Sequence, residues 1–169
     1  MGRRRWPLVV VAVVLLALLV GGCRLWPGRR PATTELVLYF PDNQAEYLVR
    51  ERRTVDTGGK SYEELALREL IAGPRAPGLT PSLPAGTRLL GVTIRDGVAQ
   101  ADFSRELKTE HPGGTAGETF TVFSIVNTLT EIRGVRSALI LIEGRRQETL
   151  AGHLDISEPL EREGTLIRD

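Results

Sequence analysis

The sequence predicts an α+β fold, a mixed sheet of about five strands with two helices packed on one face. Two observations lead to this prediction. Short strand-like segments alternate with two longer segments of helical periodicity, in the order ββαββαβ. The chain has 169 residues, of which 41% are apolar and 25% charged, and this composition is typical of globular proteins. The chain is therefore long enough to bury one modest core.

The first half of the domain begins with a pair of strands. Residues 35–40 are apolar on both faces, as in a central strand. After a turn, residues 47–55 continue as a second strand. The charged residues of this strand are Arg50, Glu51, Arg52 and Arg53. We expect them to form a solvated face. The alternative is that they contact an anionic cell-wall polymer or a partner protein.

A helix follows these strands and ends before a proline-rich loop. Ser61 and Glu64 have the spacing of a capping box, which predicts the start of the helix. Gly73 and Pro74 end the helix. Residues 75–87 combine three prolines with apolar leucines, so we expect an ordered loop rather than a linker.

The second half repeats this pattern. Residues 89–95 and 98–103 form two strands joined by Asp96-Gly97, a favoured two-residue turn. Residues 115–132 have apolar side chains at helical spacing, and residues 135–142 form a fifth strand. We expect the polar residues of this second helix to lie opposite its buried face: Thr121, Ser124, Thr128 and Glu131.

The N-terminus has the layout of a lipoprotein signal peptide. Three arginines precede Leu8–Val20, an apolar run of 13 residues, whereas a membrane-spanning helix needs about 20. The string LVGGC at positions 19–23 resembles the lipobox of bacterial lipoproteins. This resemblance implies cleavage before Cys23 and acylation of its thiol, with chains such as palmitate anchoring the protein. The alternative is an inert thiol.

These features divide the chain into four parts. We expect a signal peptide over residues 1–22, an acylated cysteine and flexible tether over 23–34, the α+β domain over 35–158, and a frayed tail over 159–169. The domain would then lie on the extracytoplasmic side of the cell membrane, anchored by lipid.

Charge and residue counts limit the partners and cofactors. Lys and Arg number 22 against 21 Asp and Glu, for a net charge of +1, and a nucleic-acid-binding protein would show a basic surplus. We therefore expect no nucleic-acid partner. A single cysteine excludes an internal disulfide and a multi-cysteine zinc site, and two histidines leave few other ligands. We expect no metal and no cofactor.

Three groups of polar residues have spacings that suggest a catalytic or metal-binding site, but we expect each group to have a structural role instead. His153 and Asp155 share a strand face, yet no nucleophile motif accompanies them. Asp96 and Asp102 could form a carboxylate pair, but we expect Asp96 to stabilise the turn and Asp102 to cap the segment that begins at Ser104. The remaining group could hold a divalent cation, but we expect a solvated loop there: Glu106, Glu110 and His111. No catalytic residue is expected.

A glycine-rich segment precedes the second helix. Free backbone N–H groups at such a position can hold an anion, but the segment lacks the lysine of a phosphate-binding loop. The first interpretation is a helix cap, with a capping box between Thr115 and Glu118. The second is an assembly or binding surface formed by Gly113, Gly114, Thr115, Gly117 and Glu118.

Four segments within residues 62–142 resemble the GerMN domain of the sporulation and spore-germination family. They are EELALRELIAGP at 63–74, LPAGT at 83–87, VAQADFS at 98–104 and GGTAGE at 113–118. The resemblance implies an envelope-anchored protein with no established catalytic reaction. It also implies a domain similar to ring-building modules, which assemble between two membranes.

Two hypotheses follow for the function. The first is a lipid-anchored, non-enzymatic scaffold of the envelope, with a role in sporulation or spore germination, that contacts envelope proteins or further copies of itself. The second is a module that binds or hydrolyses peptidoglycan, which would need a concave pocket with convergent polar groups.

Overall fold

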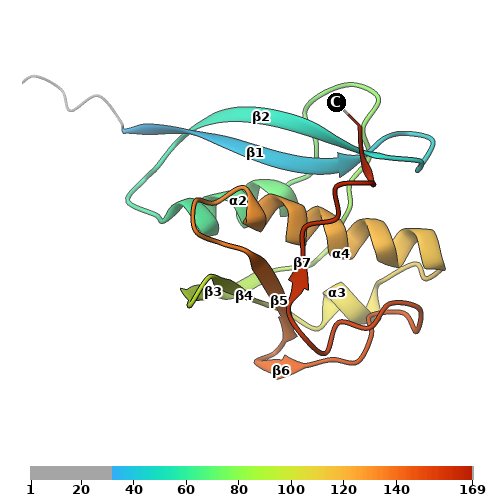
Figure 1. The fold of residues 1–169 in the computed structure, drawn as a ribbon. Helices are drawn as coiled ribbons and strands as arrows, with labels where there is room; N and C mark the ends of the chain where they lie inside the picture. The colour runs from blue at the N-terminus through green and yellow to red at the C-terminus, as the bar shows by residue number, and fades with distance from the viewer. Residues whose placement is uncertain (1–31, 169) are drawn as a thin grey trace, which may run out of the picture. The chain divides into compact units, whose positions relative to one another are not determined.

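Two antiparallel hairpins, each followed by a helix, dominate the computed structural model, which describes residues 32–168 (Figure 1). The first hairpin and its helix are β1 (Thr33–Pro41), β2 (Leu48–Asp56) and α2 (Tyr62–Ile71). The second set is β3 (Leu89–Arg95), β4 (Val98–Phe103), α4 (Thr115–Thr130) and the strand β5 (Ser137–Ile142). The short elements are α3 (Glu106–Thr109), β6 (Arg145–Arg146), β7 (Leu160–Glu161) and β8 (Ile167–Arg168). The α+β class and the predicted order of the main elements are confirmed.

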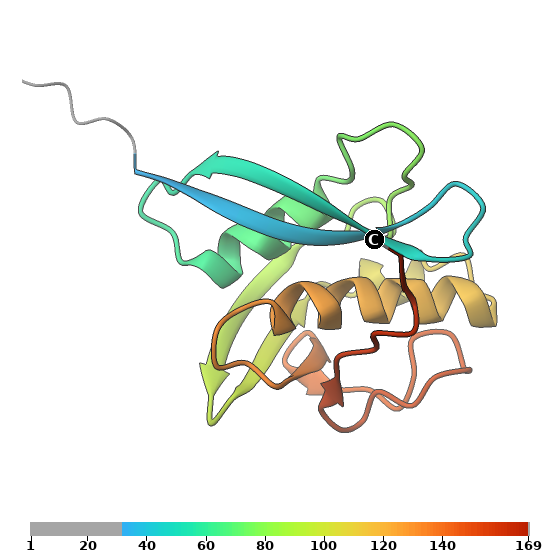
Figure 2. The same ribbon diagram turned by 45° about the horizontal axis from the view of Figure 1, so that its top comes forward.

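The strands belong to two sheets, and both helices lie between them (Figures 1 and 2). One sheet has the order β1-β2-β8; the other has the order β3-β4-β5-β6, with β7 also paired to β5. Each sheet thus has both helices on one face, as expected, but the strands do not form the single sheet that the sequence suggested. The reason is that α4 is buried nearly all around, and a helix of this kind needs cover on two sides.

The second sheet changes the environment of the polar residues of α4. Thr121, Ser124 and Thr128 are buried, although their spacing predicted an exposed face. Thr128 Oγ1 accepts a hydrogen bond of 3.2 Å from the backbone N–H of Tyr39 on β1. The core itself joins β1, α2, α4, β4 and β5 through fully buried side chains such as Leu38, Leu70 and Ile125.

The charged residues of β2 do not form one solvated face. Arg52 is exposed, but Arg53 and Glu51 are buried and form an ion pair with an N···O distance of 2.5 Å. Arg53 also donates to the backbone carbonyl of Gly73, at 2.7 Å, and to that of Glu69, at 3.1 Å. It therefore satisfies carbonyls at the C-terminal end of α2 that the helix leaves open.

The C-terminal segment is ordered, so the expected frayed tail is wrong. Leu160 pairs with Ala138 on β5, and residues 167–168 pair in parallel with β2. Between these strands, the side chain of Asn127 on α4 holds the backbone of Glu163 by bonds of 3.0 and 3.1 Å. The tail thus links the two sheets across α4. No helix within residues 32–168 has both the length and the apolar character needed to cross a membrane.

Candidate functional site

The glycine-rich segment forms a tight turn at the start of α4. Gly113 and Gly114 have φ values of +84° and +82°, a region that side-chain-bearing residues rarely adopt. Gly114 is the N-cap, Thr115 is the first helical residue, and no side chain of the described residues caps this end. The predicted capping box between Thr115 and Glu118 is therefore wrong, because the helix starts one position earlier than that motif requires and Thr115 is not the N-cap.

Glu118 is fully buried and cannot belong to an exposed binding surface. Its Oε1 accepts the N–H groups of Leu150 and Ala151 at 2.7 and 2.8 Å, and its Oε2 accepts that of His153 at 2.8 Å. Burial raises the pKa of this carboxyl, but these backbone donors together outweigh it, so the net pKa lies below its usual value. Glu118 thus fastens the loop at residues 149–154 to α4.

His111 completes a hydrogen-bond chain behind the glycine turn. Its Nδ1 accepts the N–H of Gly113 at 3.0 Å, and its Nε2 lies 3.1 Å from Thr121 Oγ1. Thr121 Oγ1 itself donates to the carbonyl of Ser82 at 2.6 Å, so we assign the Nε2 proton of a neutral imidazole to the His111–Thr121 bond. Burial lowers the pKa of His111, in agreement with the neutral form.

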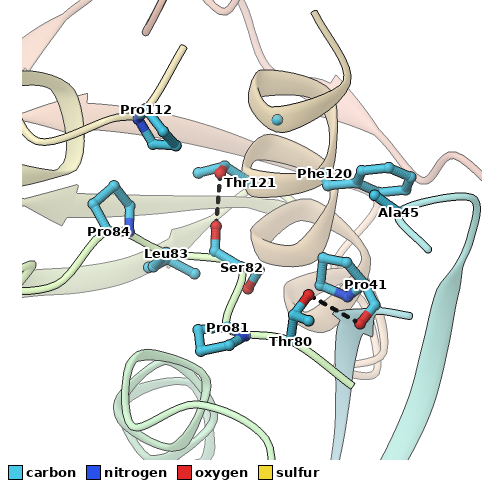
Figure 3. A pocket seen from close by; sticks show the side chains of 11 residues that line it. Pro41, Ala45, Thr80, Pro81, Ser82, Leu83, Pro84, Pro112, Phe120 and Thr121 are labelled. Atoms are coloured by element: carbon cyan, nitrogen blue, oxygen red, sulfur yellow. Dashed lines mark hydrogen bonds between the residues drawn. The ribbon is translucent and has the colours of Figure 1, made fainter. Parts of the chain in front are cut away.

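A pocket of about 220 Å³ opens beside this turn (Figure 3). Three segments meet there: the end of β1 with the following turn, the proline-rich loop, and the first turns of α4 with the loop that precedes them. The lining is mainly apolar and includes four prolines: Pro41, Ala45, Thr80, Pro81, Ser82, Leu83, Pro84, Pro112, Gly117, Phe120 and Thr121. Ser82 Oγ is buried and has no hydrogen-bond partner within the part of the chain that the structure describes.

The shape and lining of this pocket suit an apolar side chain rather than a whole small molecule. Pockets for drug-sized ligands usually measure about 300–1,000 Å³. The two titratable side chains nearest to the glycine turn, His111 and Glu118, already hold internal partners. The glycine segment therefore contributes Gly117 to an apolar cavity, while Gly114 and Thr115 remain exposed at the turn.

The other polar candidates lie apart or have structural roles. Asp155 accepts bonds from the backbone and hydroxyl of Ser157, at 2.9 and 2.6 Å, within an irregular segment instead of the expected strand. Asp96 occupies the turn before β4, while Asp102 near the end of β4 accepts the N–H of Gly144 at 2.8 Å. The two residues lie at opposite ends of the extended strand β4, with Cα atoms up to about 20 Å apart, so their carboxylates form no pair.

The expected solvated loop at residues 106–111 also has internal contacts. Glu106 lies 3.5 Å from Arg88 and 3.7 Å from Arg105, and Glu110 accepts a bond of 3.2 Å from Thr109. Across residues 32–168, no three His, Cys, Asp or Glu side chains are grouped so that they could hold a metal ion. Cys23 lies outside the described residues.

The pocket itself was not predicted. Its signals in the sequence were the ordered proline-rich loop and the apolar Phe120, but they lie about 40 residues apart. Only the packed structure brings them together with the turn after β1.

Comparisons with known proteins agree with this fold. A family model described as "Germane: Sporulation and spore germination" matches residues 37–148. A search of curated proteins gives no match. A crystal structure of a candidate lipoprotein from Clostridium perfringens is 30% identical, with a TM-score of 0.55, and the match covers 77% of this chain and 88% of that one.

Two solved structures of the sporulation protein GerM from Bacillus subtilis are also similar, each at 25% identity. The tandem GerMN domains match with a TM-score of 0.65 over 81% of this chain and 48% of theirs. The first GerMN domain alone matches with a TM-score of 0.60, over 76% of this chain and 98% of that domain. The match to the family model, together with the resemblance found in the sequence, shows that the chain belongs to the GerMN-domain family of sporulation and spore germination.

Proposed function

We propose that this chain is a lipid-anchored, non-enzymatic GerMN protein on the extracytoplasmic side of the cell membrane. It acts by binding other envelope proteins in sporulation or spore germination. The family assignment supports the process, and the similar candidate lipoprotein from Clostridium perfringens supports the anchor. The lipobox-like string ending at Cys23 supplies the residue to be acylated.

One observation carries the binding role. The two titratable side chains at the glycine-rich start of α4 have internal partners, since Glu118 accepts bonds from a loop and His111 contacts Thr121. The feature that remains open beside this turn is the proline-lined pocket. Pockets that accept a single apolar anchor are typical of protein–protein contacts, where a few buried side chains carry most of the binding energy.

The binding role is tested by capturing the tagged full chain from membranes of growing and sporulating cells. We expect a protein partner with the native chain and its loss with Gly117→Leu, which places a side chain in the pocket. Ala116→Leu is the matched control, because Ala116 is exposed on the same helical turn and does not line the pocket. Recovery of wall fragments without a protein partner would contradict the proposal and favour the peptidoglycan-binding hypothesis.

The anchor is tested separately with Cys23→Ala. We expect this variant to remain an uncleaved precursor or to leave the membrane fraction, and metabolic labelling with a fatty acid should mark only the native chain. Normal processing and labelling of the variant would show that Cys23 is not the acylated residue.

A further inference from the structure

One edge of the five-stranded sheet is open. β3 is the end strand of its sheet, and within residues 32–168 no strand pairs with its outer edge (Figure 2). Such an edge presents unpaired backbone N–H and C=O groups and can accept a further strand. Proteins usually protect these edges, so an open one is a candidate contact surface.

The side chains of β3 are unusually apolar for an exposed edge. Leu90 is 51% exposed and Ile94 is 38% exposed, and they are two of the three large apolar residues that the described chain leaves exposed. A β-bulge between Leu89 and Gly91 sets Leu90 outside the regular pairing with β4. Beyond this bulge, residues 91–95 pair in regular register with β4 and offer an even edge.

A groove runs between this edge and α2. It consists of two adjoining hollows, of about 280 and 310 Å³, which share Arg68 of α2 and Leu89 of β3. The groove follows α2 from Ser61 to Ile71, which is about 15 Å at the rise of an α-helix. An extended segment of four or five residues has about the same length.

The charges along the groove favour an acidic occupant. Arg68 and Arg88 line it, with side chains 52% and 66% exposed. Glu64 is the acid among the lining residues, and its contact with Arg68 is an exposed i,i+4 pair, a weak kind of ion pair. Glu106 contacts Arg88 from outside the groove at a longer distance of 3.5 Å.

A second copy of β3 is a poor occupant. The apolar part of the strand lies between Arg88 and Arg95. If the β3 strands of two copies paired antiparallel so that their apolar stretches overlapped fully, Arg88 of one copy would lie opposite Arg95 of the other. Like charges directly opposite in a sheet destabilise the pairing.

We propose that the groove binds an extended acidic segment of a partner protein, which adds to the sheet as a strand next to β3. Backbone hydrogen bonds to the edge would provide affinity, as in other strand-addition complexes. Apolar side chains of the segment would lie against Leu89 and Val92, and its carboxylates would pair with Arg68 and Arg88. The proposal rests on the proposed binding role for its biological context, but it concerns a surface other than the proline-lined pocket.

The test uses the full chain in detergent and a fluorescein-labelled synthetic heptapeptide. The peptide alternates valine and threonine and carries two glutamates at one end; a second peptide has lysines in place of the glutamates. We expect saturable anisotropy changes with the acidic peptide, and binding at least about tenfold weaker with the lysine peptide. N-methylation of alternate peptide nitrogens should abolish binding, because it removes the strand's donors.

Two protein variants locate the site. The double change Arg68→Glu and Arg88→Glu should weaken binding by at least about tenfold, and Arg52→Glu by less than about twofold. Arg52 is a matched control, since it is an exposed arginine paired to Glu35 on the other sheet. Equal binding of both peptides, an equal effect of Arg52→Glu, or no saturable binding up to about 1 mM would overturn the proposal. None of these results would affect partner capture through the pocket.

Discussion

Replacing Glu118 by glutamine should destabilise the domain although the side chain keeps its shape. The carboxylate is fully buried and accepts three backbone N–H groups at 2.7–2.8 Å. The amide of Glu118→Gln can keep the two bonds to Leu150 and Ala151, without the help of a charge, but its NH₂ group would face the N–H of His153.

The cost can be worked from these contacts. A hydrogen bond to a charged group contributes about 1.5–3 kcal/mol, and an unsatisfied buried donor costs about 1–3 kcal/mol. One lost bond and two weakened bonds give about 2–4 kcal/mol. This is a large share of the roughly 5–15 kcal/mol that stabilises an ordinary domain. In a domain of this size the melting temperature should fall by about 10 °C.

The assay is urea denaturation of residues 32–169 followed by circular dichroism, with Asp102→Asn as the control. Asp102 also accepts a backbone N–H at 2.8 Å, but at an exposed site, so its variant should lose less than about 1 kcal/mol. A loss below about 1 kcal/mol for Glu118→Gln would show that the buried carboxylate does not stabilise the loop.

The pH dependence provides a second check on Glu118. Its pKa is lower in the folded chain than in the unfolded chain, where the reference value is 4.5. Its contribution is therefore complete above that unfolded pKa and is lost as the pH falls through the folded pKa. The stability difference between the native chain and Glu118→Gln should shrink over this acid range, and a constant difference would contradict the lowered pKa.

Three further changes test other parts of the structure. Gly117→Ala should stabilise the domain by about 0.5–1 kcal/mol in denaturation, because alanine favours helix and the added Cβ would lie 3.8 Å from His111, an ordinary contact. Destabilisation would mean that the first turn of α4 needs glycine at this position. Arg53→Met should cost about 3–5 kcal/mol in the same assay, because it leaves Glu51 charged and buried; a second change, Glu51→Gln, should recover part of this loss. Removal of residues 160–169 deletes three partly buried apolar side chains and should lower the free energy of unfolding by about 3 kcal/mol. It should also speed hydrogen exchange in β2 and β5, with which this segment pairs, and an unchanged exchange pattern would show that the tail is dispensable.

The main elements of the fold could be predicted because their signals are local. The apolar run at residues 35–40, the Asp96-Gly97 turn and the capping box at Ser61 each involve a few neighbouring residues, and the structure places β1, the β3–β4 hairpin and α2 there. Ser61 Oγ accepts the N–H of Glu64 at 3.4 Å, which is the first of the two bonds of the motif, while Glu64 Oε1 accepts a bond of 2.8 Å from Arg68.

The errors arose where tertiary packing decides. Thr128 and Glu118 are polar residues on a helix, and no local pattern shows that a second sheet or a distant loop will cover them. Likewise, Arg53 is buried because its guanidinium meets the end of α2 and the ring of Phe40, at 5.3 Å. Strands of two residues, such as β7 and β8, have no periodicity to detect, so the order of the C-terminal segment depends on Asn127 and other remote contacts.

The candidate site shows the same limit. The sequence pointed correctly to the glycine-rich start of α4 as a special backbone turn, with Gly113 and Gly114 in the left-handed region. It could not distinguish the surface role of Gly117, which lines a pocket, from the internal role of Glu118. The two residues are adjacent in the chain, but the helix turns them toward different sides.

Site-specific photo-crosslinking in sporulating cells tests most directly whether this chain acts by binding a protein through the pocket. A photoreactive amino acid would replace Pro112, which is exposed at the pocket, or Glu35 as a control on the first sheet. We expect one discrete protein adduct from position 112 and none of the same mass from position 35. Adducts with peptidoglycan alone, or equal protein adducts from both positions, would contradict it.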